Sequence, residues 1–506
     1  MNSFMENLTN ATNYTRTENG ALAHKSTRSL VYDMFALGGA YRTRTVNDTI
    51  LLFKNAIEEN AELAMKCLFY LSDCRGGQGE RRLFRICYGW LANEYPEIAL
   101  KNLELIPEYR RWDDVIYSTL GTKIETQALD FIKGQLALDI TCKAPSLLAK
   151  WLPSENASSK QTRKAAETVR RHFKMTHKEY RKTLSTLRAR INVLERLMSA
   201  NRWEEIEFDK IPSKAGLIYK NAFARRDLIA KKFETFAKSK DTKVNAKVLY
   251  PYEVVSQATK HFGYYGWNNN VSDVDRAMIE KYWENIPDYL NGNPCKLMCV
   301  VDTSGSMRGS TADAPINVAI SLGMYCAERI GGPFHGHYIS FASRPQLIKV
   351  QGTDFVDKVE RIYKTNLCDN TNLEAVFDLL FNIAKDPSTN KDDIPETIVV
   401  ISDMEIDSGT RSYWTNRCDG RTWSKEHAQT EMEHIRSKWE AAGLKMPKLV
   451  YWNVEARNNT ILDGGKDVTF VSGCSPVIFE QVITGVTGYD LMLKKLLSER
   501  YAAVTA

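Results

Sequence analysis

The chain has 506 residues, of which 43% are hydrophobic and 26% charged, and its formal net charge is +6. This length is enough for more than one domain, and the composition is typical of a globular protein rather than a disordered or fibrous one. No apolar run reaches the roughly 18 residues that a membrane span requires, and the polar N-terminus lacks the apolar core of a signal peptide. We therefore expect a cytoplasmic protein that has no membrane partner. We also expect a monomer.

Cysteine usage agrees with this compartment. The ten cysteines are scattered, and no pair has the CxxC spacing of a zinc or redox site. Cys299 and Cys326 lie in apolar segments, where a reduced thiol buried in the core is expected.

The N-terminal half is dominated by helical periodicity. Residues 1–20 read as a flexible arm, and residues 21–290 as a helical domain. Three segments carry the clearest pattern: TILLFKNAIEENAELAMKCLFYLSD (49–73), RRLFRICYGWLANEY (81–95) and TQALDFIKGQLALDI (126–140). Short breaks separate them, such as CRGGQGE (74–80), which lacks the ending of a phosphate-binding loop and reads as an interhelical turn. Stacked helix pairs of this kind predict an all-α, HEAT-like solenoid.

A basic run lies within this half. Between Lys160 and Arg196 twelve Lys and Arg residues stand against three acidic ones, Glu167, Glu179 and Glu195. Such an excess indicates a polyanionic partner. The alternative is a solvated helix face without a partner.

The pattern changes at Gly292-Asn293-Pro294, and residues 291–506 read as a second domain. Short apolar segments rich in β-branched residues predict strands at 295–302, 337–342, 397–403 and 448–454. Helical patterns at 314–330, 372–385 and 425–442 alternate with them. This alternation predicts a largely parallel, doubly wound α/β sheet, in which ligands bind at the carboxyl ends of the strands.

Oxygen-bearing side chains follow two of these strands. Asp302, Ser304 and Ser306 come directly after the first strand, Asp403 ends a later one, and Thr371 lies in a loop between them. An all-oxygen set with few charges suits a hard octahedral cation such as Mg²⁺. The alternative is that the two serines cap the next helix while the aspartates merely end strands.

The segment VVDTSGSM (300–307) resembles the metal-ion-dependent adhesion site of von Willebrand factor A (vWA) domains, whose pattern is DxSxS with a later Thr and a later Asp. The resemblance implies a vWA domain over residues 291–506, with Mg²⁺ or another divalent cation at a site made by Asp302, Ser304, Ser306, Thr371 and Asp403. Thr371 lacks the glycine that often precedes this threonine in relatives, and Thr365 is a competing candidate.

Four segments of the N-terminal half resemble the TROVE module of Ro ribonucleoproteins, a ring of HEAT-like helices closed by a vWA domain. They are LGGAYRTRT (37–45), FYLSDCRGGQGERRLFRI (69–86), KMTHKEYRKTLSTLR (174–188) and VLYPYEVV (248–255). The whole chain is most similar to a largely uncharacterised vWA-containing family of plants, fungi and viruses. The fold class implied is a helical solenoid or ring followed by an α/β doubly wound vWA domain.

The Ro resemblance implies binding of small structured, single-stranded or misfolded RNA. Lys and Arg side chains would neutralise phosphates, and His177 falls where Ro proteins have an RNA-contacting histidine, although a surface or capping histidine is the alternative. The candidate RNA-binding residues are Arg42, Arg44, Lys160, Arg163, Lys164, Arg170, Arg171, His177, Arg181 and Arg188.

No catalytic constellation accompanies these motifs. Ser304 has no histidine nearby in the sequence, and DTSGSM is not a nucleophile elbow, so we expect a binding protein and not an enzyme. The aromatic insertion 405–424 beside Asp403 is either a partner surface or a packed flap. The alternative to an RNA-binding function is a protein–protein adhesion or assembly module, which uses the cation to bind a partner's carboxylate.

Overall fold

The computed structural model describes residues 12–260, 262–263, 266–267, 271–309, 311–365, 371–406, 431–462 and 467–506. The chain forms two compact units. The first, here called the sheet unit, contains the chain up to Thr45 and residues Ala246–Leu496. The second, the helical unit, contains Val46–Asn245 and Leu497–Ala506. The protein is therefore multidomain, with an all-α part and an α/β part.

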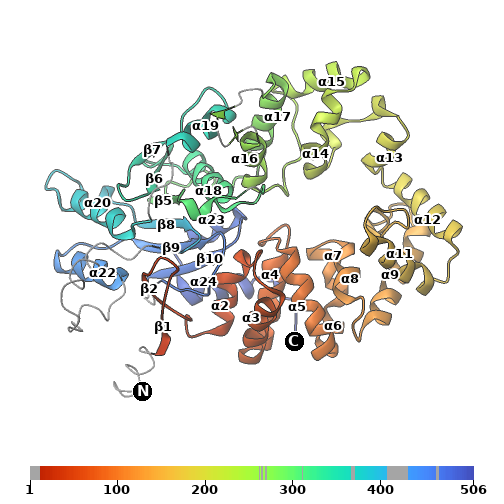
Figure 1. The fold of residues 1–506 in the computed structure, drawn as a ribbon, viewed down its shortest axis with the longest axis horizontal. Coiled ribbons are helices and arrows are strands. Elements are labelled where there is room, and N and C mark those ends of the chain that lie inside the picture. Colours follow the sequence, from red (N-terminus) through yellow and green to blue (C-terminus); the bar gives the residue numbers. More distant parts are fainter. Residues whose placement is uncertain are drawn as a thin grey trace. The chain divides into compact units, whose positions relative to one another are not determined.

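The helical unit consists of helices that pack on neighbours close in sequence, such as α3 on α4, α5 on α8 and α14 on α15 (Figure 1). Its α-helices are α3 (Val46–Glu59), α4 (Ala61–Ser72), α5 (Arg81–Glu94), α6 (Pro96–Asn102), α7 (Ile106–Tyr109), α8 (Trp112–Thr119), α9 (Glu125–Thr141), α10 (Leu148–Trp151), α11 (Lys160–His172), α12 (His177–Arg190), α13 (Leu194–Ser199), α14 (Ser213–Ala224) and α15 (Asp227–Lys238). Short 3₁₀ turns are η2 (Leu103–Leu105), η3 (Trp203–Glu205), η4 (Phe208–Lys210) and η8 (Glu499–Tyr501).

One predicted helical stretch is divided. The pattern at 49–73 forms two helices because Asn60 adopts an extended backbone, with φ −155° and ψ 100°, and its side chain accepts a hydrogen bond from the Leu63 amide. Asparagine competes with helix continuation in this way and is a favoured N-cap. The predicted turn at 74–80 does separate α4 from α5.

The sheet unit is built on a six-stranded sheet with the order β10-β9-β8-β5-β6-β7. The strands are β5 (Leu297–Asp302), β6 (His337–Phe341), β7 (Leu347–Lys349), β8 (Thr397–Ser402), β9 (Lys448–Asn453) and β10 (Val468–Ser472). All neighbours pair in parallel except the edge strand β7, which is antiparallel to β6. The parallel α/β sheet and the four predicted strands are confirmed. Thr397–Ser402 and Leu297–Asp302 are buried almost throughout, as a sheet covered on both faces requires.

The helices of this unit are α2 (Leu30–Leu37), α16 (Pro251–Thr259), α17 (Asp273–Glu284), α18 (Pro315–Arg329), α19 (Phe355–Thr365), α20 (Leu373–Lys385), α22 (Glu431–Ala441), α23 (Val477–Val482) and α24 (Gly488–Leu496), with 3₁₀ turns η1 (Gly38–Ala40), η5 (Gly305–Met307) and η6 (Lys391–Asp393). The small hairpins are β1 (Tyr14–Arg16) with β2 (Leu22–His24) and β3 (Phe262–Gly263) with β4 (Gly266–Trp267). Helix α18 packs on β5, β6 and β8, and Cys326 within it is a buried free thiol.

The unit boundaries differ from the domain boundaries that the sequence predicts. Residues 12–20 were expected in a flexible arm, but Tyr14–Arg16 is a strand paired with β2. Helix α2 packs on β10, where the Phe470 amide donates to the Tyr32 hydroxyl at 3.0 Å. Helix α16 packs on α18. Tertiary contacts of this kind have no local sequence pattern, and they place both flanks of the predicted helical domain with the sheet.

Residues 407–424 of the predicted 405–424 insertion, with Trp414 and Trp423, lie outside the described residues. In the described part of the chain, no helix is both long enough and apolar enough to cross a bilayer.

Candidate functional site

The topology of the sheet brings the two predicted aspartates together. Strand β5 lies between β8 and β6, because the chain leaves β5 toward β6 on one side and returns to β8 on the other. This reversal is the switch point at which open α/β sheets bind ligands. Asp302 ends β5, Asp403 directly follows β8, and the register pairs Val301 with Ile401. Both carboxylates therefore lie at the same edge.

The loop after β5 folds its hydroxyls around Asp302. The Ser304 amide donates to Asp302 Oδ1 at 2.9 Å, and the Ser402 hydroxyl donates to Asp302 Oδ2 at 2.6 Å. The hydroxyls of Ser304 and Ser306 lie 3.0 Å apart. Ser304 makes no side-chain cap on the short 3₁₀ turn that follows, so the capping alternative is wrong for this residue.

Hydrogen bonds also hold the loop after β8. Met404 has a φ of 65°, a strained value for a residue other than glycine, and its amide donates to the Ser402 hydroxyl at 3.0 Å. The Glu405 amide donates to Asp403 Oδ1 at 3.2 Å. The hydroxyl of Thr371 lies 3.4 Å from the Glu405 carbonyl oxygen. The structure therefore places Thr371, which is buried, beside this loop.

Burial raises the pKa of both carboxyl groups. Burial, and then the charge of Asp403, raise the pKa of Asp302 to about 7. Burial also raises the pKa of Asp403, against the opposing effect of Arg457. Two carboxylates in such surroundings favour a bound cation, because a cation stabilises their ionised forms.

The donor set fits a hard divalent cation. It combines two carboxylates with the hydroxyls of Ser304, Ser306 and Thr371, which are oxygen ligands of the kind that Mg²⁺ takes. Within the described chain, Asp403 Oδ2 is buried and accepts no hydrogen bond. Among the described residues, no group of three or more His, Cys, Asp or Glu side chains is placed to hold a metal, so a cation here depends on hydroxyl ligands.

Arg457 is the neighbour of this site that the sequence did not indicate. It follows β9, and its Nη2 lies 3.6 Å from Asp403 Oδ2 and donates to the Ser306 carbonyl oxygen. A lone arginine in a loop far along the chain from the DxSxS motif carries no local signal. Only the fold brings it to the edge of the sheet.

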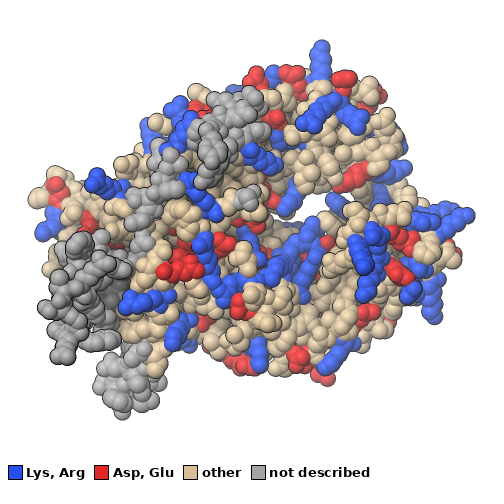
Figure 2. Space-filling model, in the orientation of Figure 1, with Lys and Arg blue, Asp and Glu red and all other residues tan. Residues whose placement is uncertain are grey.

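The predicted RNA-binding residues of α11 and α12 divide into two groups. Lys160, Lys164, Arg171, His177 and Arg181 are exposed, and Figure 2 shows Lys and Arg side chains gathered over these helices.

The second group is engaged in structural contacts, although Arg163 in it is also exposed, and Arg171 of the first group pairs with Glu167. Arg188 donates to the carbonyl oxygens of Ala149 and Leu152 at 2.8 and 2.9 Å. Arg170 pairs with Glu155 at 2.9 Å, and Arg163 donates to two carbonyl oxygens just before α11.

His177 has a local role at the start of α12. Its Nδ1 lies 2.6 Å from the Glu155 carboxylate, and the neighbouring Thr176 forms a capping box with Glu179. Its side chain is still 66% exposed, so this contact leaves part of the imidazole accessible.

Arg42 and Arg44 belong to the other unit. Arg44 donates to the carbonyl oxygen of Arg457 and lies over the Tyr41 ring, while Arg42 lies over the Tyr252 ring. The structure therefore does not bring these two arginines into one compact unit with α11 and α12.

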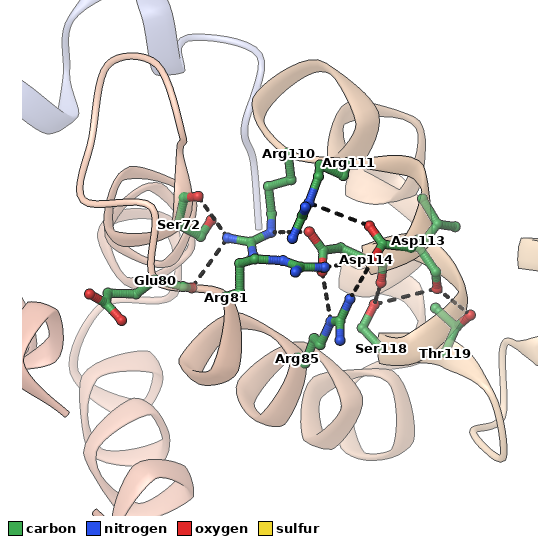
Figure 3. Close-up of polar contacts among 11 residues, drawn as sticks. Ser72, Glu80, Arg81, Arg85, Arg110, Arg111, Asp113, Asp114, Ser118 and Thr119 are labelled. Carbon is green, nitrogen blue, oxygen red and sulfur yellow. Dashed lines mark hydrogen bonds and ion pairs between the residues drawn. The ribbon is translucent and has the colours of Figure 1, made fainter. Parts of the chain in front are cut away.

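A further charged cluster lies in the helical unit, at the junction of α5 and α8 (Figure 3). Arg81 and Arg85 of α5 pair with Asp113 and Asp114 of α8, at distances of 2.6 to 3.1 Å. The buried Arg110 lies 3.3 Å from Asp114 and donates to the carbonyl oxygens of Ser72 and Glu80. The carboxylates interleave with the arginines, so the cluster ties helices together.

These features define a two-unit protein with a carboxylate and hydroxyl cluster at the switch point of its sheet. The family model described as "Domain of unknown function (DUF2828)" matches residues 17–115 and 139–293, half of the chain, and the chain belongs to this family. A second model, "Domain of unknown function (DUF7788)", matches residues 296–488.

Two individual proteins are similar to the chain. "Uncharacterized protein L728" of Acanthamoeba polyphaga mimivirus is 28% identical over 492 residues, covering 89% of this chain and 80% of that protein. The crystal structure of the Ro (RSR) protein of Deinococcus radiodurans superposes with a TM-score of 0.49 at 13% identity, covering 93% of this chain and 99% of that one.

Proposed function

We propose that the sheet unit binds a divalent cation, Mg²⁺ in the first instance, in the manner of a vWA adhesion site, and uses it to bind a carboxylate of a partner. One observation carries the proposal: the buried Asp302 and Asp403 follow neighbouring strands at the switch point, beside the paired hydroxyls of Ser304 and Ser306, and a buried oxygen of Asp403 accepts no hydrogen bond within the described chain. Thr371 lies beside the loop that follows Asp403. Asp302, Ser304, Ser306, Thr371 and Asp403 would hold the ion, directly or through water. A partner carboxylate would complete its octahedral shell.

Thermal unfolding with Mg²⁺ and with EDTA tests the cation site. Ligand at a hundred times its Kd stabilises the folded state by about 2.7 kcal/mol, and in a unit of this size each kcal/mol raises Tm by roughly 2–4 °C. We expect Mg²⁺ to raise the Tm of the wild type by several degrees and to leave Asp302→Asn unchanged. In EDTA, Asp302→Asn should be at least as stable as the wild type, because the repulsion of Asp403 is removed.

The control is Asp313→Asn, which removes an exposed carboxylate from the same stretch of chain. It should respond to Mg²⁺ as the wild type does. A wild type whose Tm is the same in Mg²⁺ and EDTA would refute the cation site.

A second function, RNA binding by the helical unit, is favoured by the exposed basic face of α11 and α12. Lys160, Lys164, Arg171 and Arg181 are exposed there, and Lys174, Lys178 and Lys182 extend the face. Lysine and arginine bind phosphates without regard to sequence, and unpaired RNA gives a salt slope near −0.7 per phosphate neutralised. The Ro-like motifs of the sequence support RNA as the polyanion.

Filter binding of single-stranded RNA at several salt concentrations tests this second function. We expect replacement of Lys160, Lys164, Arg171 and Arg181 by Gln to weaken binding and to reduce the slope by about 3. The control replaces four exposed residues of the same unit, Arg225, Lys231, Lys240 and Lys243, with the same change in charge. Equal losses of RNA affinity in both variants, or no RNA binding by the wild type, would refute the proposal that this face binds RNA.

A further inference from the structure

Arg457 occupies an unusual position for a residue beside a cation site. Its guanidinium brings a positive charge within 3.6 Å of Asp403 Oδ2, the oxygen that lacks a hydrogen bond in the described chain. The side chain is 31% exposed, and it also donates to the carbonyl oxygen of Ser306. A divalent cation at Asp403 would be repelled by this guanidinium. Arg457 and the cation therefore compete for the same carboxylate.

The same guanidinium faces two other carboxylates. Glu18 Oε2 lies 3.7 Å from Nη1, and Glu455 Oε2 lies 3.9 Å from Nε. Glu18 is in the turn between β1 and β2. Arg457 thus contacts Glu18 and Glu455 at the same time as Asp403, and these two carboxylates can hold it when its attraction to Asp403 is lost.

The turn that carries Glu18 is docked on the residues directly after Asp403. Thr17 donates to the Ile406 carbonyl oxygen at 2.7 Å, and the Glu18 amide donates to the Glu405 carboxylate at 2.5 Å. Asn19 donates to the Glu405 carbonyl oxygen at 2.6 Å. Asn458, the neighbour of Arg457, lies 3.2 Å from the carboxylates of both Glu18 and Glu405. The hairpin, the loop after β8 and the Arg457 segment form one hydrogen-bonded assembly.

We propose that Arg457 sets the cation affinity of this site by exchanging between Asp403 and Glu18, so that cation binding tightens the docking of the β1–β2 hairpin. The inference rests on the cation site proposed above. Without the cation, Arg457 neutralises part of the charge of Asp403. With the cation bound, the guanidinium moves closer to Glu18 and strengthens the ion pair that it already makes with the hairpin. The N-terminal hairpin would thereby sense whether the site is loaded.

Titration of the full-length protein with Mn²⁺, followed by loss of the free-ion EPR signal, tests the exchange. We expect Arg457→Gln to lower the Kd for Mn²⁺ by about fivefold or more, the lower part of the range for coupled sites. Glu18→Gln should raise the Kd, because Arg457 then remains on Asp403. Arg457→Lys, which keeps the charge, should stay near the wild type and serves as the folded control if Arg457→Gln is unstable.

The double variant separates exchange from general electrostatics. If Glu18 acts through Arg457, Glu18→Gln should have little effect in the Arg457→Gln background, whereas independent charges would give additive changes. Hydrogen exchange supplies a second readout. Mn²⁺ should slow exchange in residues 12–24 of the wild type and not in Arg457→Gln.

The outcomes distinguish the two proposals. If no variant and no wild type binds Mn²⁺, the cation site itself is refuted, and the exchange with it. If all bind with equal Kd, the site stands and the role of Arg457 is overturned. A weaker Kd for Arg457→Gln would make Arg457 only a support of the Ser306 loop and would also overturn the exchange.

Discussion

Asp114 is the carboxylate on which three arginines converge at the junction of α5 and α8 (Figure 3). Burial alone would raise the pKa of Asp114, but the guanidiniums of Arg110, Arg81 and Arg85 together hold it below the usual range. For Asp113, burial dominates and the pKa is raised. Two adjacent aspartates in one cluster therefore make opposite contributions to the pH dependence of stability.

Asp114→Asn should destabilise the helical unit by about 3–5 kcal/mol at pH 7, because it leaves the buried Arg110 without its counter-charge. The folded pKa of Asp114 is depressed, so its ionisation stabilises the protein above the unfolded value of about 3.9, and this contribution is lost as the pH falls through the folded value. The difference in the free energy of unfolding between the wild type and the variant should therefore become smaller below about pH 4. Urea unfolding at pH 7 and pH 3.5 measures this difference.

The matched control is Asp113→Asn. Its folded pKa is raised, so ionisation of Asp113 opposes folding, and the variant should cost less at pH 7 than Asp114→Asn. Equal deficits for the two variants at pH 7, or a deficit for Asp114→Asn that does not change with pH, would contradict the account.

For single residues, the sequence predicted those that lie together in one local motif. Asp302, Ser304 and Ser306 share one loop after an apolar strand. Asp403 follows the neighbouring strand β8, and Thr371 lies beside the loop after that strand. Their role as metal ligands stays a prediction. Arg457 and the hairpin contacts of Glu405 were not predicted, because they join segments far apart in the chain.

At the scale of elements, length and burial decided which strands could be predicted. The buried strands β5, β8 and β9 have continuous apolar sequences. The edge strand β7 has only three residues, which are exposed or half-exposed, and it carries no pattern. Strand β10 is buried throughout, but its sequence VTFVS is too short for the pattern to predict a strand. Asn60 divides α3 from α4 through an extended backbone that helical periodicity does not register.

The contact between α18 and β5 fixes the strand that carries Asp302. Gly323 of α18 lies so close to β5 that a Cβ there would meet Val301 Cγ2 at 2.4 Å. Gly323→Ala should therefore push the helix from the strand at a cost of about 1–3 kcal/mol, as overpacking does. Because Val301 precedes Asp302, the variant should also show a smaller rise in Tm with Mg²⁺.

A second substitution tests whether the clash with Val301 causes the loss of stability in Gly323→Ala. Val301→Ala removes the methyl group that Gly323→Ala would strike, so the double variant should recover stability relative to Gly323→Ala alone. Failure of this rescue in thermal unfolding would show that the cost of the alanine arises elsewhere in α18.

At the scale of the whole molecule, chain order and compact units do not coincide. The first 45 residues belong with the sheet, and the last ten belong with the helices that begin at Val46. Polar and aromatic contacts hold the last ten residues against these helices. The buried Lys66 Nζ donates to the carbonyl oxygens of Tyr501 and Val504 at 2.8 and 2.7 Å, and the Arg500 side chain pairs with Asp73. No periodicity within a segment predicts such a return of the chain.

Tyr501 has the largest buried side chain in the C-terminal segment. Its side chain is fully buried, its ring stacks on Tyr109 with centroids 5.7 Å apart, and its hydroxyl lies 3.1 Å from the Asp73 carboxylate. Tyr501→Ala should destabilise the helical unit by about 3–5 kcal/mol, the usual cost of removing a buried aromatic side chain. Hydrogen exchange should accelerate in α3, α4 and α5, while β5, β8 and β9 keep the protection of the wild type.

The control is Tyr489→Ala, which replaces a 40% exposed tyrosine of the sheet unit and should leave exchange in α3, α4 and α5 unchanged. Equal acceleration in the sheet strands of Tyr501→Ala would mean that the C-terminal ten residues stabilise both units, and the assignment of this segment to the helices alone would be wrong.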